Sequence, residues 1–483
     1  MTLPNPLLLA LPELIVVGAA LLLLVGGAFR GRPSPAFAGA AVVALLAAAL
    51  AAALVPLGRA FSGALILDAG AVFAKAVIYL ASAVAVALGD RWLARRGTAT
   101  FEDPVLVLLA ALGMGMMVSA GDLISLYVSI ELHSLALYIL AAFLRDDERS
   151  SEAGLKYFVL SALSSGLLLY GASLIYGFAG STRFDLIAQA LRASGTHPAG
   201  GPGVLFGLVF LMCGFGFKLS AAPFHMWTPD VYDGAPTPIV GFFAGAPKLA
   251  AMVLLARVLS QAFGAASWEW RQILVAMALM SVAVGAFGGL TQTRLKRLWA
   301  YSSIATIGYV LVGLAAGGVI GIQSMLMYMV LFIVDVTGFF ACLGGITRGG
   351  KPLETMDDFA GLARERPAMA ACMTIFALSA LGLPPLGELW GKFYVFRAAW
   401  AAGSGLGIAA VLALVGSVVA AFFYLRVVKV MWLDPSKGPT DPPTLEARIA
   451  AYGLALFAFP IVLVALAPLD LATRAAAIAL ARP

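Results

Sequence analysis

The sequence predicts an all-α polytopic membrane protein, and three observations carry this prediction. Of the 483 residues, 62% are hydrophobic and only 12% are charged, whereas a soluble domain carries about 25% charged residues. Apolar runs long enough to cross a hydrocarbon core of about 30 Å follow one another along nearly the whole chain. No polar stretch between them is long enough to form a core of its own. We therefore expect one membrane domain over residues 1–483.

The apolar runs predict fourteen transmembrane helices. They lie at residues 7–29, 36–57, 65–88, 104–120, 121–144, 153–178, 203–222, 237–263, 271–290, 299–317, 320–346, 367–400, 406–432 and 448–467. The first run holds Glu13 and has no basic segment before it, so it is predicted to stay as a membrane helix and not to be a cleaved signal.

The basic residues between the spans predict the orientation. If the N-terminus lies outside, the inner loops hold 18 Lys and Arg residues and the outer segments hold 6. Because inner loops carry the excess of positive charge, both termini are predicted to lie outside. The net charge of +6 is scattered over loops without an aromatic-interleaved patch, which argues against nucleic-acid binding.

The three cysteines predict neither a metal site nor a disulfide. Cys213, Cys342 and Cys372 fall in or near apolar helices, without a C-x-x-C pair and without histidine at ligand spacing. Residues 184–193, between the sixth and seventh spans, have apolar residues at helical spacing. This segment is predicted to lie along the outer surface, and an ordinary loop helix is the alternative.

Two spans are interrupted by proline. In the seventh, Pro223 follows Lys218, and in the twelfth, Pro384 and Pro385 precede Lys392. Proline leaves backbone carbonyls without a partner, which is tolerated in a membrane only where protein or water satisfies them. The two breaks lie five spans apart, so we predict two inverted five-helix repeats, spans 4–8 (104–263) and 9–13 (271–432). Helices 1–3 (1–103) precede them and helix 14 (448–467) follows; such repeats with broken helices are typical of ion transporters.

Charged residues inside the spans are the candidate functional residues, because charge at bilayer depth costs about 2.5–3.5 kcal/mol. Glu131 lies about ten residues into its span, hence about 15 Å deep. Lys248 is also near the midplane. Lys218 lies closer to one end, so snorkelling to the interface is an alternative for this residue alone.

Other polar residues are weaker candidates. Glu388 stands four residues before Lys392, so an ion pair on one helix face is possible. Lys156 starts the sixth span and is more typical of an interface lysine, and Lys75 lies in the third span. His133 is more typical of a structural residue, whereas His225, beside the first break, is the better candidate for a proton-bridging imidazole.

These residue types suit proton transfer. Burial destabilises a charged lysine, and a neighbouring carboxylate stabilises it. Moving or neutralising Glu131 would therefore release a proton from Lys218. A buried Lys and Glu pair that can be separated is thus a switch.

Five motifs carry a resemblance to a known family. They are SIELHSLALYILAAF, SSEAGLKYFVLSALSSGLLLYGASLIYG, FKLSAAPFHMWTPDVYDGAPTPI, LKRLWAYSSI and LPPLGELWGKFYVF. Together they resemble the N-subunit family of bacterial NADH-quinone oxidoreductase, respiratory complex I, over about residues 100–435. The sister antiporter-like subunits usually have a second histidine after a W-L-P motif. This chain reads WTPDVYDGAP there, with Val231 and Tyr232 in place of the histidine, which favours the N subunit.

The resemblance implies roles for particular residues. Glu131 and Lys218 would be an interacting pair, Lys248 the central relay, Lys392 the terminal lysine and Lys156 a supporting lysine. It also implies that the chain binds no NADH, flavin, iron–sulfur cluster, quinone or metal, and that redox chemistry in partner subunits drives proton movement. The implied partners are K-, M- and J-like membrane-arm chains in a bacterial inner membrane.

Three positions depart from the family pattern. Thr306 stands where the family usually has a histidine, and Asp335 stands where it usually has an asparagine. Glu388 and Leu389 replace a usual Gly-Phe pair. Asp335 and Glu388 add two acids that could modulate or replace the missing link. Two alternatives to a proton-translocating subunit therefore stay open, namely an Mrp-type cation/proton antiporter and a structural scaffold that no longer pumps.

Overall fold

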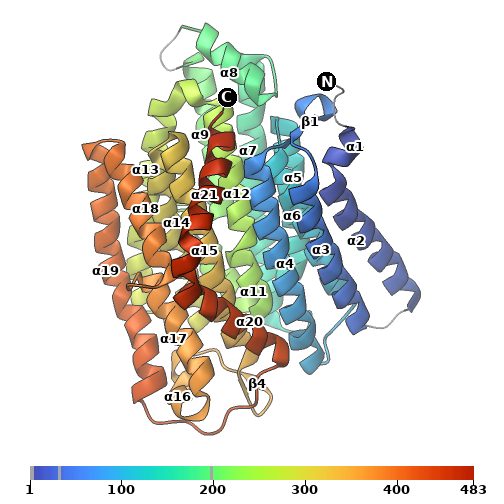
Figure 1. Ribbon diagram of the computed structural model, residues 1–483, viewed down its shortest axis with the longest axis vertical. Helices are drawn as coiled ribbons and strands as arrows, with labels where there is room; N and C mark the ends of the chain where they lie inside the picture. Colours follow the sequence, from blue (N-terminus) through green and yellow to red (C-terminus); the bar gives the residue numbers. More distant parts are fainter. Residues whose placement is uncertain (1–4, 31–33, 196–198, 483) are drawn as a thin grey trace.

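The computed structural model describes residues 5–30, 34–195 and 199–482, and these residues fold into a bundle of helices (Figure 1). The helices are α1 (Pro6–Leu9), α2 (Leu11–Arg30), α3 (Pro35–Leu54), α4 (Ala69–Arg95), α5 (Glu102–Ser119), α6 (Leu123–Ala141), α7 (Glu148–Ala179), α8 (Phe184–Ala193), α9 (Gly201–Leu219), α10 (Thr228–Gly234), α11 (Thr237–Ala244), α12 (Ala246–Arg257), α13 (Ser267–Leu290), α14 (Leu295–Ala315), α15 (Gly318–Gly345), α16 (Leu362–Glu365), α17 (Pro367–Leu381), α18 (Gly387–Ala401), α19 (Ser404–Leu433), α20 (Leu445–Leu456) and α21 (Val462–Ala481). Short 3-10 or π turns are η1 (Phe61–Gly63), η2 (Val258–Ala262), η3 (Gly264–Ala266), η4 (Met356–Phe359) and η5 (Phe457–Ile461).

Extended structure is confined to two small antiparallel hairpins in the described residues. Strand β1 (Gly58–Ala60) pairs with β2 (Leu65–Leu67), and β3 (Thr347–Arg348) pairs with β4 (Lys351–Pro352). The first hairpin lies near the end of the bundle that holds both termini and α8, and the second lies at the opposite end with α16 (Figure 1).

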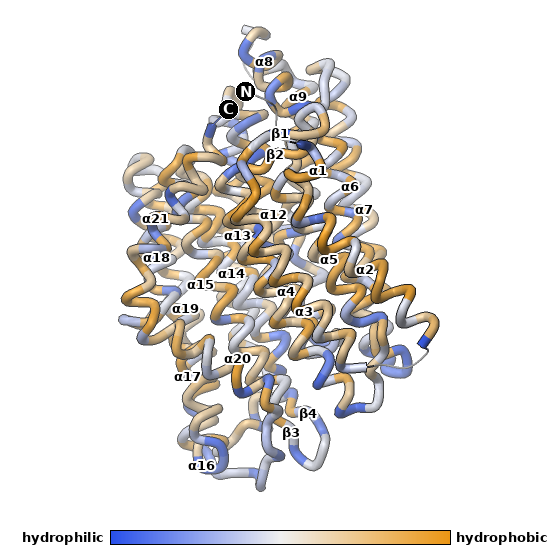
Figure 2. Tube along the Cα trace, turned by 45° about the vertical axis from the view of Figure 1, so that its right-hand side comes forward, coloured by the Kyte–Doolittle hydropathy of each residue, from blue (hydrophilic) through white to orange (hydrophobic). Residues whose placement is uncertain are grey.

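The predicted fold class is confirmed. Among the described residues, thirteen helical segments are long and apolar enough to cross a membrane. The predicted twelfth span is divided into α17 and α18, each too short to count alone, and together they make the fourteenth crossing. Apolar residues fill the middle of the bundle, and polar residues gather at its two ends (Figure 2). Helix α8 has the predicted bounds and buries Phe184, Ile187 and Leu191 against the bundle.

The two predicted helix breaks are present. Helix α9 ends at Leu219, where Ser220 adopts a left-handed conformation with φ 61°, and α10 begins only at Thr228. Helix α17 ends at Gly382, with φ 91°, five residues before α18 begins. The division into inverted repeats at 104–263 and 271–432 stays a prediction.

The structure adds two interruptions that we did not predict. The eighth span is divided at Gly245 (φ −103°, ψ −86°), one turn before Lys248, because the following Pro247 occupies the first turn of a new helix. The last span bends at η5, which contains Pro460, and continues to Ala481. Our prediction ended this span at residue 467, so the observed helix extends beyond it.

Candidate functional site

Lys218 is buried at the broken end of α9. Its side chain is 6% exposed, and its Nζ donates hydrogen bonds of 2.8 Å to the hydroxyls of Ser134 on α6 and Ser161 on α7. Ser161 also accepts a 2.5 Å hydrogen bond from Tyr138. The lysine does not reach the interface, so the snorkelling alternative is wrong for it.

Glu131 lies near Lys218 but makes no ion pair with it among the described residues. Its carboxylate accepts a hydrogen bond from Ser165 of α7. Ser161 and Ser165 are four residues apart, so they share one face of α7. The carboxylate of Glu131 and the ammonium group of Lys218 are therefore hydrogen-bonded to neighbouring hydroxyls of a single helix.

Lys248 is buried in the first turn of α12. Its side chain is 1% exposed, and its Nζ donates a 2.5 Å hydrogen bond to Ser303 of α14. The ring of Tyr232 lies 5.6 Å from the same nitrogen. The break at Gly245 places this lysine at a helix start inside the bundle, where no carboxylate of the described residues pairs with it.

Lys392 lies beside the second helix break. Its Nζ donates to the carbonyls of Ala380 and Leu381, at 3.0 and 2.7 Å, and to the hydroxyl of Ser417 at 2.7 Å. These carbonyls belong to the end of α17, where a helix leaves acceptors without partners. The lysine therefore satisfies acceptors that the break exposes.

Helix α14 connects the two lysines. Ser303 accepts from Lys248, and the ring of Tyr309 lies 5.3 Å from the Nζ of Lys392. Because Ser303, Thr306 and Tyr309 recur every three residues, they lie along one side of the helix. The outer two are six residues apart, about 9 Å along the axis. Thr306 stands between them, at the position where the resemblance led us to expect histidine.

Asp335 on α15 and Glu388 on α18 are completely buried, at 1% and 0% exposure. The ion pair that we considered between Glu388 and Lys392 is not formed, because the lysine directs its hydrogen bonds to the end of α17 and to α19. The two carboxyl groups face each other instead.

The remaining candidates are Lys156 and the two histidines. Lys156 is 40% exposed and pairs with Glu152 at 2.6 Å and Asp230 at 2.8 Å, as expected of an interface lysine. His225 lies half-buried in the first break, and His133 is buried beside Lys218. Neither imidazole shows a hydrogen bond to one of the three buried lysines among the described residues.

Two other charged residues in the spans have structural partners. Lys75 pairs with Glu13 at 2.6 Å, with 0% and 8% of the side chains exposed. Arg257 is 0% exposed and binds Asp68 through two hydrogen bonds of 2.7 and 2.9 Å. These pairs hold α2 against α4, and α12 against the start of α4.

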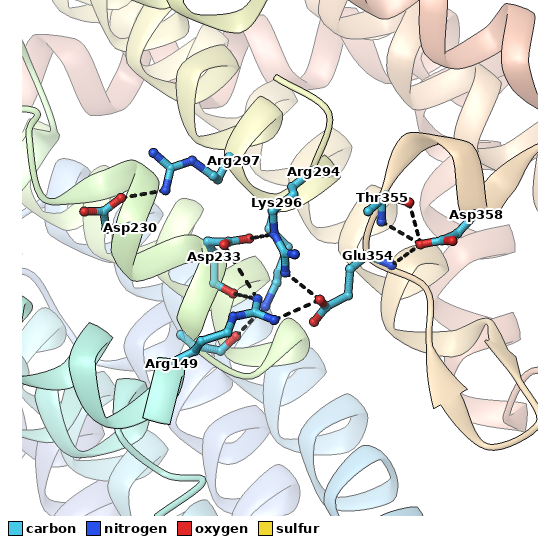
Figure 3. Close-up of polar contacts among 10 residues, drawn as sticks. Arg149, Asp230, Asp233, Arg294, Lys296, Arg297, Glu354, Thr355 and Asp358 are labelled. Atoms are coloured by element: carbon cyan, nitrogen blue, oxygen red, sulfur yellow. Dashed lines mark hydrogen bonds and ion pairs between the residues drawn. The ribbon is translucent and has the colours of Figure 1, made fainter. Parts of the chain in front are cut away.

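Charged residues also gather around the start of α14, and Figure 3 shows their contacts in close-up. We call them the charged cluster: Arg149, Asp230, Asp233, Arg294, Lys296, Arg297 and Glu354. Glu354 accepts from Arg149 at 3.0 Å and from Arg294 at 2.5 Å, and Arg294 also donates to Asp233 at 2.6 Å. The cluster joins α7, α10, the start of α14 and the loop before η4.

The charged cluster shifts the ionisation of its carboxylates. Burial alone would raise the pKa of Glu354, but the hydrogen bond from Arg149 and the positive charges of Lys296 and Arg294 outweigh it, so this pKa lies below its usual 4.5. Sequence reasoning placed Lys296 in a loop, whereas it is 5% exposed and donates to the carbonyl of Ala235. Its position one residue into an apolar helix was the signal for burial.

A groove of about 1450 Å³ lies beside the charged cluster. Its lining includes the charged residues Glu102, Arg145 and Glu354, and also Tyr138. Since the Tyr138 hydroxyl donates to Ser161, which accepts from Lys218, a line of hydrogen bonds connects the groove with the first buried lysine.

Fourteen crossings around a row of buried lysines define an antiporter-like polytopic membrane protein. The chain belongs to the family described as NADH:quinone oxidoreductase/Mrp antiporter, whose model matches residues 120–419. Within that family it is of the subunit N type. A relative from Caulobacter sp. (strain K31), named NADH-quinone oxidoreductase subunit N, is 63% identical over 98% of both chains.

Solved structures agree with this assignment. A chain of respiratory complex I from Thermus thermophilus with bound aureothin has a TM-score of 0.80 and 32% identity, covering 95% of this chain and 98% of that one. A chain of the Mrp complex from Dietzia sp. DQ12-45-1b has a TM-score of 0.81 but 22% identity, covering 98% and 97%. The second similarity shows a common fold alone, so it gives the Mrp-type alternative no further support.

Proposed function

We propose that this chain is a proton-translocating subunit in the membrane arm of NADH-quinone oxidoreductase, with protons passing Lys218, Lys248 and Lys392. One observation carries the proposal: these three lysine residues are 6%, 1% and 8% exposed, and among the described residues none of their ammonium groups makes an ion pair. A buried charge without a counter-ion is costly, so each group can exchange a proton without breaking a salt bridge.

Uptake would begin at the groove. Protons would reach Lys218 through Tyr138 and Ser161, and the charge of Lys218 would respond to Glu131 across the α7 serines. The side of α14 formed by Ser303, Thr306 and Tyr309 would then connect Lys248 with Lys392. With water between these hydroxyls, a proton could cross the bundle by short hops. Lys156 would support this path only from the surface, through Asp230.

The driving force would come from partner subunits. Moving one charge against 100 mV requires about 2.3 kcal/mol, and we infer that flavin, iron–sulfur clusters and quinone reside in partner chains while this chain holds no cofactor. We place the chain in the bacterial inner membrane beside K-, M- and J-like chains. Both termini lie at one end of the bundle (Figure 1), and the 18 to 6 split of basic residues supports a periplasmic position for them.

Replacing each lysine by glutamine tests the function. Glutamine removes the titrating charge but can still donate to Ser134, Ser161, Ser303 or Ser417. We expect Lys218→Gln, Lys248→Gln and Lys392→Gln each to lower the protons pumped per NADH oxidised in inside-out membrane vesicles at least twofold.

Lys437→Gln, at an exposed lysine in the loop after α19 and away from the groove, is the matched control and should pump normally. Normal pumping by all three buried-lysine variants, in fully assembled complexes, would show that the chain is a scaffold.

A further inference from the structure

The carboxyl groups of Asp335 and Glu388 form a buried pair without a donor. Asp335 lies on α15, Glu388 lies in the first turn of α18, and both side chains are within 1% of complete burial. All four carboxyl oxygens lack a hydrogen-bond partner in the described part of the chain. Ionised carboxylates accept hydrogen bonds and cannot donate them, so two carboxylates facing each other satisfy neither.

The nearest cation does not supply the missing donors. An ammonium group has three N–H donors, and Lys392 directs its own to Ala380, Leu381 and Ser417. The amide N–H of Glu388 is also used, because it donates to Ser379 at 3.1 Å.

Hydroxyl groups and one ammonium group face the pair from the surrounding elements. These groups are Tyr309 from α14, Tyr328 from α15, Ser379 from α17, Lys392 from α18 and Tyr424 from α19. The π turn η5, which also packs against α15 and α18, has the sequence FAFPI and brings no titratable side chain. Lys392 is therefore the one positive charge facing the pair from these elements.

The charge count then fixes the number of protons. With both acids ionised, the group of Asp335, Glu388 and Lys392 would carry a net charge of −1 inside the bundle, and an uncompensated buried charge costs several kcal/mol. With one proton on the pair, the net charge is zero. That proton also supplies the missing donor, as an O–H of one carboxyl pointing to the oxygen of the other.

We propose that Asp335 and Glu388 share one proton and act as a proton-loading site that exchanges with Lys392. In the exchange, an N–H bond of the Lys392 ammonium breaks and an O–H bond forms on the ionised carboxyl. The products are a neutral amine and two neutral carboxylic acids. The net charge of the three groups is zero before and after the transfer, so the step separates no charge in the membrane interior.

The pair is tested by infrared difference spectroscopy on the assembled oxidoreductase. The carbonyl stretch of a protonated carboxylic acid, shifted by exchange into D2O, is measured for the native complex and for Asp335→Asn and Glu388→Gln. Each amide donates an N–H to the remaining carboxylate, which then no longer needs a proton. We expect both single variants to lose one protonated acid per chain at neutral pH.

Asp146→Asn, at an exposed aspartate, is the matched control and should leave this band unchanged. Retention of the band in either single variant overturns the sharing, because an independently protonated acid would survive loss of its neighbour. Absence of the band in the native complex overturns it as well.

The exchange with Lys392 rests on the proposed function, and a second readout separates the two. In vesicles with equal amounts of assembled complex, Glu388→Gln should lower the protons pumped per NADH oxidised at least twofold. If Glu388→Gln loses the band but pumps normally, the loading role is wrong. The proposed function is then still tested separately by the pumping of Lys218→Gln. If the lysine variants pump normally and the band behaves as expected, the proposed function fails, and with it the loading role.

Discussion

Asp68→Asn should destabilise the protein strongly, because it leaves the buried guanidinium of Arg257 without its counter-ion. Arg257 is 0% exposed and makes two hydrogen bonds to Asp68 and a third, of 3.1 Å, to the carbonyl of Val118. Removing one partner of a buried ion pair costs about 3–5 kcal/mol. Asparagine keeps one acceptor for the arginine, so we expect a loss of about 3 kcal/mol in the free energy of unfolding.

The substitution isolates the ion pair from helix capping. Asp68 also caps α4 by accepting from Ala71 N at 2.8 Å, and asparagine caps a helix about as well as aspartate. The free energy of unfolding is measured by SDS titration of the purified chain in mixed micelles. The double variant Asp68→Asn with Arg257→Met removes both charges and should recover most of the loss. A change under about 0.5 kcal/mol, typical of a surface site, would refute the reasoning.

Two further predictions concern the charged cluster and the packing of α7. The pKa of Glu354 lies below its usual 4.5, so its ion pairs stabilise the fold fully above pH 4.5, and this contribution is lost as the pH falls through the pKa of the folded state. Glu354→Gln should therefore flatten the acid limb of a plot of unfolding temperature against pH. An unchanged acid limb would contradict this reasoning. A Cβ at Gly171 would lie 2.6 Å from a backbone carbonyl of α9, whereas one at Gly166 meets nothing within 4 Å. Gly171→Ala should thus lower the unfolding free energy by about 1–3 kcal/mol, and Gly166→Ala should not; equal SDS titration curves for the two variants would refute this.

The hydropathy of the sequence was sufficient to predict the number and the approximate bounds of the membrane crossings. Hydropathy over about 20 residues is a local property, so most predicted spans lie within a few residues of the observed helices. It failed at the C-terminal span, where the helix continues past residue 467 although it contains Asp470. The structure satisfies that carboxylate with Gln323 at 2.8 Å and Tyr394 at 2.5 Å, which the local sequence could not show.

Proline positions predicted two helix breaks but not all of them. Pro223 and Pro384 follow long apolar runs, and the chain does leave the helix there. The break at Gly245 escaped prediction because Pro247 alone could equally produce a gentle kink. Packing of the flanking helices decided that the backbone departs from the helix at Gly245.

The sequence by itself determined which charges lie at bilayer depth, because depth follows from counting residues along a helix. Only the tertiary structure decided what each charge contacts. Lys75 and Arg257 form ion pairs with carboxylates, which are structural contacts. Lys218, Lys248 and Lys392 instead donate hydrogen bonds to hydroxyls and carbonyls. The physical reason is that these contacts join helices far apart in the chain, and the packing of whole helices, which no local pattern encodes, sets which faces meet.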